Sequence, residues 1–306
     1  MKNSYWAYVI GGVIVIVLIV VAIRSKSGQL VTSQDALERA VANMLAADRY
    51  HVSAELQLDL PSQRNPAQLV DVTMRTEGDV EETEDGTLYG GNLFVEAKGR
   101  GLVLFTEGEL RLLPDSVAFK LDSLPALLNP EGTLANKWTY VDSPVLHSNN
   151  SAAINEAILN VSRSLQRRGS EEIPGGVGQG IHYQGQLTAD QEDQLIAVLQ
   201  QSVSGSRAWN VIARLLKAFD LNAIDVWVQE NGVPQLRHVK LTFEKADIQN
   251  DEAEAVLVFT FGDFGKDVAI EAPDREITVS SEVFTRLFGE GEVTTINQEQ
   301  SDEPGQ

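Results

Sequence analysis

The chain has 306 residues, of which 43% are hydrophobic, enough to bury a sizeable core in one large domain or two small ones. Acidic residues outnumber basic residues by 44 to 24, and a net charge of −20 repels phosphate backbones, so nucleic acid is not an expected partner. The chain contains no cysteine, which excludes disulfides, thiolate metal sites and cysteine nucleophiles.

The stretch from Ala7 to Ile23 reads AYVIGGVIVIVLIVVAI, and no charge interrupts the chain between Lys2 and Arg24. As a helix it would be roughly 26 Å long, close to the thickness of a bilayer core of about 30 Å. No small-residue cleavage site follows it, so we expect an uncleaved membrane anchor over residues 1–26, with a short cytoplasmic start. The flanking charges nearly balance, so they leave the orientation open.

A short tether over residues 27–32 precedes an amphipathic helix over residues 33–48, which Thr32 or Ser33 can cap. Apolar and polar residues then alternate, which predicts strands that bury one face in an antiparallel sheet. We expect Pro61 to end the first strand. The predicted strands of this first meander are residues 51–60, 70–80, 87–97, 101–105, 109–113 and 117–121.

The middle of the chain is more helical. A helical turn over residues 123–128 and a strand over 138–141 precede a predicted helix over 151–168 and a glycine-rich loop over 169–180. After a strand over 181–187, Thr188 and Gln191 form a capping box that predicts the start of another helix. A further short helix is expected over residues 208–219.

A second meander follows, and its Asn231-Gly232 dipeptide between alternating runs is a strong hairpin signal. Residues 290–306 are acidic and polar, and we expect them to be disordered. This order predicts one α+β domain over residues 33–289, a curved antiparallel sheet packed over helices. The predicted strands of the second meander are residues 223–229, 236–243, 253–261 and 268–270.

Candidate catalytic and metal-binding residues are few. His51, His147, His182 and His238 lie in separate elements, and none has a partner at metal-ligand spacing. The acidic segment ending at Asp85-Gly86 lacks the bidentate glutamate of a calcium loop, so a hairpin tip is the favoured interpretation. No nucleophile-and-base motif is present, so we expect no enzyme, no metal and no cofactor.

The remaining candidates are apolar and aromatic. They form either a closed hydrophobic core or the lining of an apolar pocket on the concave face of the sheet, and periodicity cannot separate the two. The candidate pocket residues are Leu56, Leu58, Met74, Leu104, Phe105, Trp209, Trp227, Phe243 and Phe259, with Phe261 beside them.

Three segments resemble the LppX/LprG-type lipoproteins and the wider LolA-like group. They are Leu128-Asn129-Pro130-Glu131-Gly132-Thr133-Leu134-Ala135, Asp225-Val226-Trp227-Val228, and the run from Phe261 to Val268. The resemblance implies a half-barrel of antiparallel strands over helices, with a cavity for acyl chains, on the outer side of the membrane. The chain departs from the lipoproteins because it lacks the lipid-bearing cysteine, and the segment from Ala7 to Ile23 would replace that anchor.

The resulting hypothesis is a membrane-anchored, extracytoplasmic protein that holds a lipid or another hydrophobic ligand. The alternative is a filled scaffold or sensor domain that holds no ligand and binds another protein of the cell envelope.

Overall fold

In a computed structural model, the described residues are 35–62, 65–83, 86–99, 102–114, 116–122, 135–142, 151–176, 178–202, 219–245, 254–274 and 277–279. The expected anchor, tether and acidic tail lie outside them, as do the predicted helical turn at 123–128 and most of the predicted helix at 208–219. None of the helices in the described ranges has the length and hydropathy needed to cross a bilayer.

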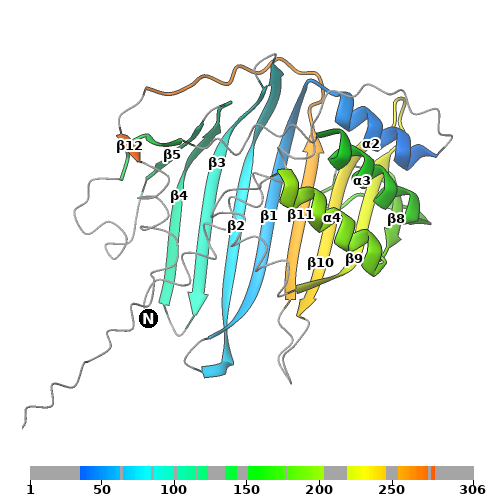
Figure 1. The fold of residues 1–306 in the computed structure, drawn as a ribbon, viewed down its shortest axis with the longest axis horizontal. Coiled ribbons are helices and arrows are strands. Elements are labelled where there is room, and N and C mark those ends of the chain that lie inside the picture. Colours follow the sequence, from blue (N-terminus) through cyan, green and yellow to red (C-terminus); the bar gives the residue numbers. More distant parts are fainter. Residues whose placement is uncertain are drawn as a thin grey trace, which may run out of the picture.

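The described strands form one sheet of twelve, and the antiparallel architecture predicted from the sequence is confirmed. Their order across the sheet is β12-β6-β5-β4-β3-β2-β1-β11-β10-β9-β8-β7. Every neighbouring pair is antiparallel except β12 and β6. The sheet is open and uncurled, so the curvature expected of a half-barrel is not seen in it (Figure 1).

The strands of the first half are long because alternating sequences pair in continuous register with their neighbours. Their bounds are β1 Arg49–Ser62, β2 Asn65–Thr83, β3 Gly86–Gly99, β4 Leu102–Leu112, β5 Ser116–Leu121 and β6 Thr139–Asp142. Those of the second half are β7 Gln166–Glu172, β8 Gln179–Gly185, β9 Phe219–Gln229, β10 Gln235–Lys245, β11 Glu254–Gly262 and β12 Ile277–Val279.

Three helices lie together over the end of the sheet that contains β8 to β11 (Figure 1). They are α2 Ala36–Ala46, α3 Ser151–Ser164 and α4 Ala189–Ser202. Helix α2 contacts β9 and β10, α3 contacts α2, and α4 contacts α3. The helices therefore gather on one face of the sheet, as the α+β prediction requires.

The helix starts differ from expectation at α2 and agree with it at α4. Asp35, rather than Thr32 or Ser33, caps α2, because its Oδ1 accepts a hydrogen bond of 2.7 Å from the Leu37 N–H. At α4 the capping box forms as predicted. The Gln191 N–H donates to Thr188 Oγ1 at 3.3 Å, and the Thr188 N–H donates to Gln191 Oε1 at 3.0 Å.

Two predictions in the first meander are wrong. Residues 101–105 and 109–113 do not form separate strands, because β3 pairs with β4 in one unbroken register from Leu102 to Leu112. Pro61 does not end β1 either. It lies opposite Leu69 beside a register shift, a position where a proline is tolerated because the ladder is already irregular.

Three further predictions fail in the second half. The helix predicted over 151–168 ends at Ser164, and residues 166–172 form strand β7 where a helix end and a loop were expected. Its charged, glycine-containing sequence has little intrinsic β propensity, so pairing with β8 decides its conformation. Residues 268–270 form no strand, whereas β12 was not predicted at all.

Candidate functional site

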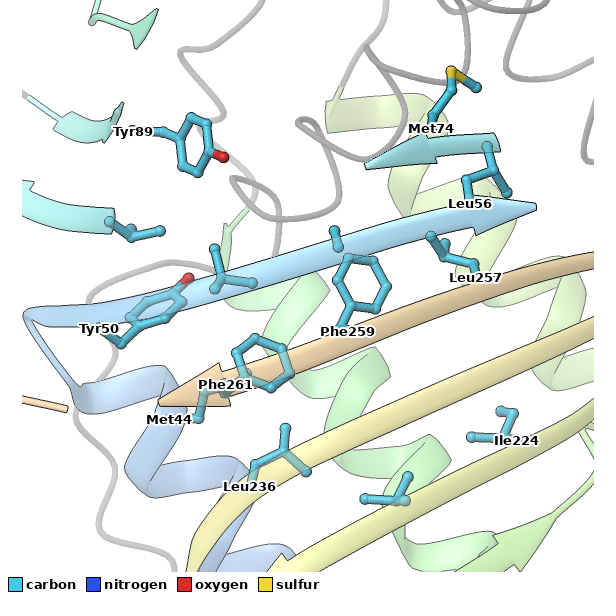
Figure 2. Close-up of a cluster of buried hydrophobic side chains, with 14 of the residues drawn as sticks. Met44, Tyr50, Leu56, Met74, Tyr89, Ile224, Leu236, Leu257, Phe259 and Phe261 are labelled. Atoms are coloured by element: carbon cyan, nitrogen blue, oxygen red, sulfur yellow. The ribbon is translucent and has the colours of Figure 1, made fainter. Parts of the chain in front are cut away.

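The candidate site is the apolar face of the sheet that carries the helices. Leu56 of β1 lies directly opposite Met74 of β2 on one side and Leu257 of β11 on the other. Leu58, two residues along β1, therefore points to the same face as Leu56. Figure 2 shows the side chains of Leu56, Met74 and Leu257 close together on the neighbouring strands β1, β2 and β11. Three of the predicted pocket residues thus meet on one surface.

Phe259 and Phe243 belong to the same face. Phe259 lies opposite Ala54 of β1, and its ring stacks with that of Phe261 at a centroid distance of 6.3 Å. Phe243 lies opposite Ala255 of β11 and is half-buried against the core. The face therefore carries the rings of Phe243 on β10 and of Phe259 and Phe261 on β11.

The apolar face continues across nine adjacent strands, from β5 to β8. At a strand spacing of about 4.8 Å, this is a width of about 38 Å. The buried side chains that define it on β2 to β5 are Val72, Met74, Val80, Tyr89, Leu93, Val95, Leu110, Leu112, Phe119 and Leu121. Those on β8, β9 and β10 are Ile181, Tyr183, Ile224, Val226, Val228 and Leu236.

Phe105 and Trp227 lie on the opposite face of the sheet from Leu56 and Met74. Phe105 is opposite Glu96 of β3, and 53% of its surface is exposed. Trp227 is opposite His182 of β8 and His238 of β10. The structure therefore does not bring these two rings together with the others. Leu104 is in β4, but its side chain is outside the described residues, as is the whole of Trp209.

A polar cluster surrounds Trp227, and it was not predicted from the sequence. His182 Nε2 lies 2.9 Å from Asp225 Oδ1, and His182 Nδ1 lies 3.1 Å from Glu171 Oε1. The Trp227 Nε1–H donates to the same Glu171 oxygen at 2.7 Å. The imidazole of His182 thus lies between two carboxylates, and one of these carboxylates also holds the indole.

Ring stacking extends this cluster to β10. The rings of His182 and Trp227 are parallel, with centroids 4.4 Å apart, and His238 meets the indole edge-on at 5.1 Å. His238 Nδ1 lies 3.1 Å from Thr260 Oγ1 of β11. Burial lowers the pKa of His238 from its ordinary value of 6.5, and nearby Lys240 lowers it further. The cluster therefore joins Glu171 of β7 and His182 of β8, through the Trp227 indole, to His238 of β10.

The two imidazoles beside Trp227 differ in their partners. The hydroxyl beside His238 belongs to Thr260, whereas His182 has a carboxylate on each side. Within the described ranges, no group of three or more His, Asp or Glu side chains is arranged to hold a metal ion. Of the other histidines, His51 contacts Asp79 at 2.8 Å and Glu77 at 3.3 Å, and His147 is outside the described residues.

A shallow polar depression of about 460 Å³ lies next to this cluster, between β7, β8 and the end of α3. Arg168 donates from Nε to Gln184 Oε1 at 3.1 Å within it. Its lining contains amides, a guanidinium and a hydroxyl, but no buried apolar surface of the kind that binds an acyl chain. The lining residues are Ser164, Gln166, Arg168, Gln184, Gly185, Gln186 and Ala223.

No family model matches the chain, and no curated protein matches it. Among solved structures, it is similar to a Mycobacterium avium subs paratuberculosis protein described as a tesB protein. The two are 14% identical over 74% of this chain and 84% of that chain, with a TM-score of 0.12. A likeness this weak carries no argument about fold or activity.

Proposed function

We propose that this chain is a membrane-anchored, extracytoplasmic binding protein that holds a lipid or another hydrophobic ligand against the apolar face of its sheet. The observation that carries the proposal is the width of that face. The described helices gather over β8 to β11, whereas buried apolar side chains continue across β1 to β5.

Burial alone would bind the ligand. Removing apolar surface from water contributes roughly 25 cal/mol per Å², so burying about 200 Å² of an acyl chain would contribute about 5 kcal/mol. No charged group is needed, and the buried side chains of β2 and β3 on this face are aliphatic, aromatic or hydroxyl groups. The ligand class is therefore apolar chains rather than polar metabolites.

The proposal also includes the membrane anchor at residues 7–23 and the placement of the domain outside the cytoplasm. Residues 7–23 have the length and apolar composition of a membrane helix, and the tether that follows is short. The LppX/LprG-type and LolA-like proteins that the sequence resembles act outside the cytoplasm. What supports the comparison with their half-barrels is the general arrangement of this chain, an antiparallel sheet with helices on one face. A protein held in this way can receive or pass on a ligand near its own membrane.

A second candidate function is a scaffold that binds another envelope protein and holds no ligand. The observation in its favour is that side chains on the apolar face are closely packed. Met74, Val52 and Ala54 are fully buried among their neighbours. A core that is already filled has no room for an acyl chain.

Photo-crosslinking separates these two functions in the intact chain. Cells that express the protein are given a fatty acid with a photoreactive diazirine, and the labelled peptides of the purified chain are identified by mass spectrometry. Any lipid will label residues 7–23 if they lie in the membrane, which provides the internal control. Labelling of β1, β2 or β3 supports ligand binding, and labelling confined to residues 7–23 refutes it.

A matched pair of variants at adjacent positions sharpens the test. Leu93 points to the apolar face between Thr76 and Gly108, whereas its neighbour Phe94 points to the opposite face beside Arg75. Leu93→Phe fills space on the ligand side and should reduce labelling of β1 to β3 several-fold. Phe94→Leu should leave it unchanged.

A further inference from the structure

One edge of the sheet is incomplete along the first half of β4. Strand β3 pairs with β4 over its whole length, but β5 pairs only with Gly108 to Leu112. In Figure 1, β5 covers only part of the length of β4. Residues 102–107 therefore have a strand neighbour on one side only within the part of the chain that the structure describes.

The backbone groups that face this edge can be identified. The Asp122 N–H donates to the Glu107 carbonyl at 2.9 Å, so the backbone of Glu107 faces the β5 side. In a strand, the N–H and C=O of one residue point to the same side, and successive residues alternate. Val103 and Phe105 therefore direct their N–H and C=O groups to the open edge, while Leu104 and Thr106 pair with β3.

The side chains at this edge are unusually apolar for an exposed strand. Val103 is 56% exposed and Phe105 is 53% exposed, and both point away from the face that carries the helices. An exposed, apolar strand edge invites another strand to pair, and natural proteins block such edges with charges, prolines or bulges.

The opposite edge of the same sheet shows this protection. Strand β7 carries Arg167, Arg168, Glu171 and Glu172, and a register shift between Arg167 and Gly169 interrupts its ladder. The edge at β4 has none of these devices between Leu102 and Phe105. Within the described ranges, this stretch of β4 is therefore an unprotected edge that suits a strand-shaped partner.

The charges near this edge indicate what kind of partner fits. Glu96 opposite Phe105 and Lys98 opposite Val103 pair with each other at 2.6 Å, so their charges offset. The exposed Glu107 follows Phe105 on the same face of β4 and has no ion pair within the part of the chain that the structure describes. A second copy of this chain would carry the same net charge of −20 and be repelled, whereas a cationic segment would be attracted.

We propose that residues 102–107 of β4 are a docking site for an extended, cationic segment of another protein, which adds to the sheet as a further strand. Its backbone pairs with the N–H and C=O groups of Val103 and Phe105. Its apolar side chains cover the Val103 and Phe105 side chains, and a Lys or Arg residue of the segment meets Glu107. The inference goes beyond ligand binding, because it uses the other face of the sheet and holds with or without a ligand.

The probe is a labelled octapeptide of alternating valine and lysine, added to the full chain in detergent and followed by fluorescence anisotropy. Two control peptides isolate the contributions of the backbone and of the charge. One has alternate backbone amides N-methylated, and the other has glutamate in place of lysine. We expect saturable binding of the first peptide and at least tenfold weaker binding of both controls.

Variants of the chain test the position of the site. Phe105→Pro removes an N–H that faces the open edge and leaves the ladder with β3 intact, so it should weaken binding at least tenfold. Val103→Thr should weaken binding several-fold. Val233→Thr removes an equally exposed valine from the β9–β10 turn and should have no effect.

The outcomes are distinguishable from those of the crosslinking experiment, because peptide binding does not require a bound lipid. If Phe105→Pro does not fold, Val103→Thr and the N-methylated peptide still test the inference. Absence of saturable binding would overturn it, as would equal binding of the glutamate or N-methylated peptide. A dimer that Phe105→Pro dissociates would assign the edge to a second copy instead.

Discussion

Replacing Trp227 by phenylalanine tests how the outward-facing cluster holds the β7 edge. The substitution keeps a ring between His182 and His238 but removes the Nε1–H that donates to Glu171 at 2.7 Å. Because β7 has charged residues and little intrinsic β propensity, we expect this side-chain hydrogen bond to β9 to help hold β7 in the sheet.

The magnitude follows from the exposure of Glu171. A hydrogen bond to a charged group contributes about 1.5–3 kcal/mol. About half of the Glu171 side chain is exposed, so water replaces part of the lost interaction and the loss falls to about 1 kcal/mol. The smaller ring buries less apolar surface, which adds about 1 kcal/mol. Trp227→Phe should therefore lower the free energy of unfolding by about 2 kcal/mol.

Urea denaturation of a double-mutant cycle separates these two contributions. With Glu171→Ala, which removes the acceptor, the coupling energy to Trp227→Phe should be about 1 kcal/mol. With Glu172→Ala, the next residue along β7, it should be close to zero. Equal coupling for the two glutamates would show that the hydrogen bond does not hold β7, and the reasoning would fail.

Three further predictions concern the core, the buried histidine and α4. A Cβ at Gly91 would lie against the Tyr89 hydroxyl, a buried group whose pKa is raised to about 12 by that burial. Gly91→Ala should therefore lower the free energy of unfolding by about 3 kcal/mol, and an unchanged urea midpoint would contradict this. Because the pKa of His238 is lowered in the folded state, the unfolded state takes up this proton first as the pH falls below 6.5. The free energy of unfolding should therefore drop between pH 7.5 and 5.5 by more in the wild type than in His238→Gln. Equal drops in the two proteins would contradict this prediction. Thr188→Ala removes the cap that bonds to Gln191 and should cost about 1 kcal/mol, measured as a shift of the thermal midpoint that Thr188→Ser does not show.

Much of the sheet could be predicted because one of its faces is buried. In β1, residues from Tyr50 to Leu58 alternate between buried and half-exposed positions, and a period of two fixes both the strand and its inward face. Strand β7 has no such pattern. Its conformation depends on its pairing with β8, and a single sequence does not reveal that pairing.

The apolar face was predictable only where the sequence alternates. Leu56, Leu58 and Met74 stand between polar residues, so their common face follows from the pattern. Phe105 ends an unbroken apolar run, and Trp227 lies between two valines. Such runs do not say which side chain points inward, so these two rings were grouped with residues of the opposite face.

The polar cluster required knowledge of which strands are neighbours. His182 and Asp225 are separated along the chain by α4 and by residues outside the described ranges, yet they are adjacent in β8 and β9. Glu171 was missed for a further reason, because its strand was predicted to be a loop. The only signal within a single segment was that Asp225 and Trp227, two residues apart in a predicted strand, point to the same side.

Native mass spectrometry of the full-length chain tests the proposed function most directly. The protein is purified from the expressing cells in mild detergent and released from the micelle in the gas phase. We predict a population heavier than the bare chain by the mass of one lipid, which organic extraction removes and identifies. A chain observed only at its bare mass, with no lipid in the extract, would contradict ligand binding and leave the scaffold function.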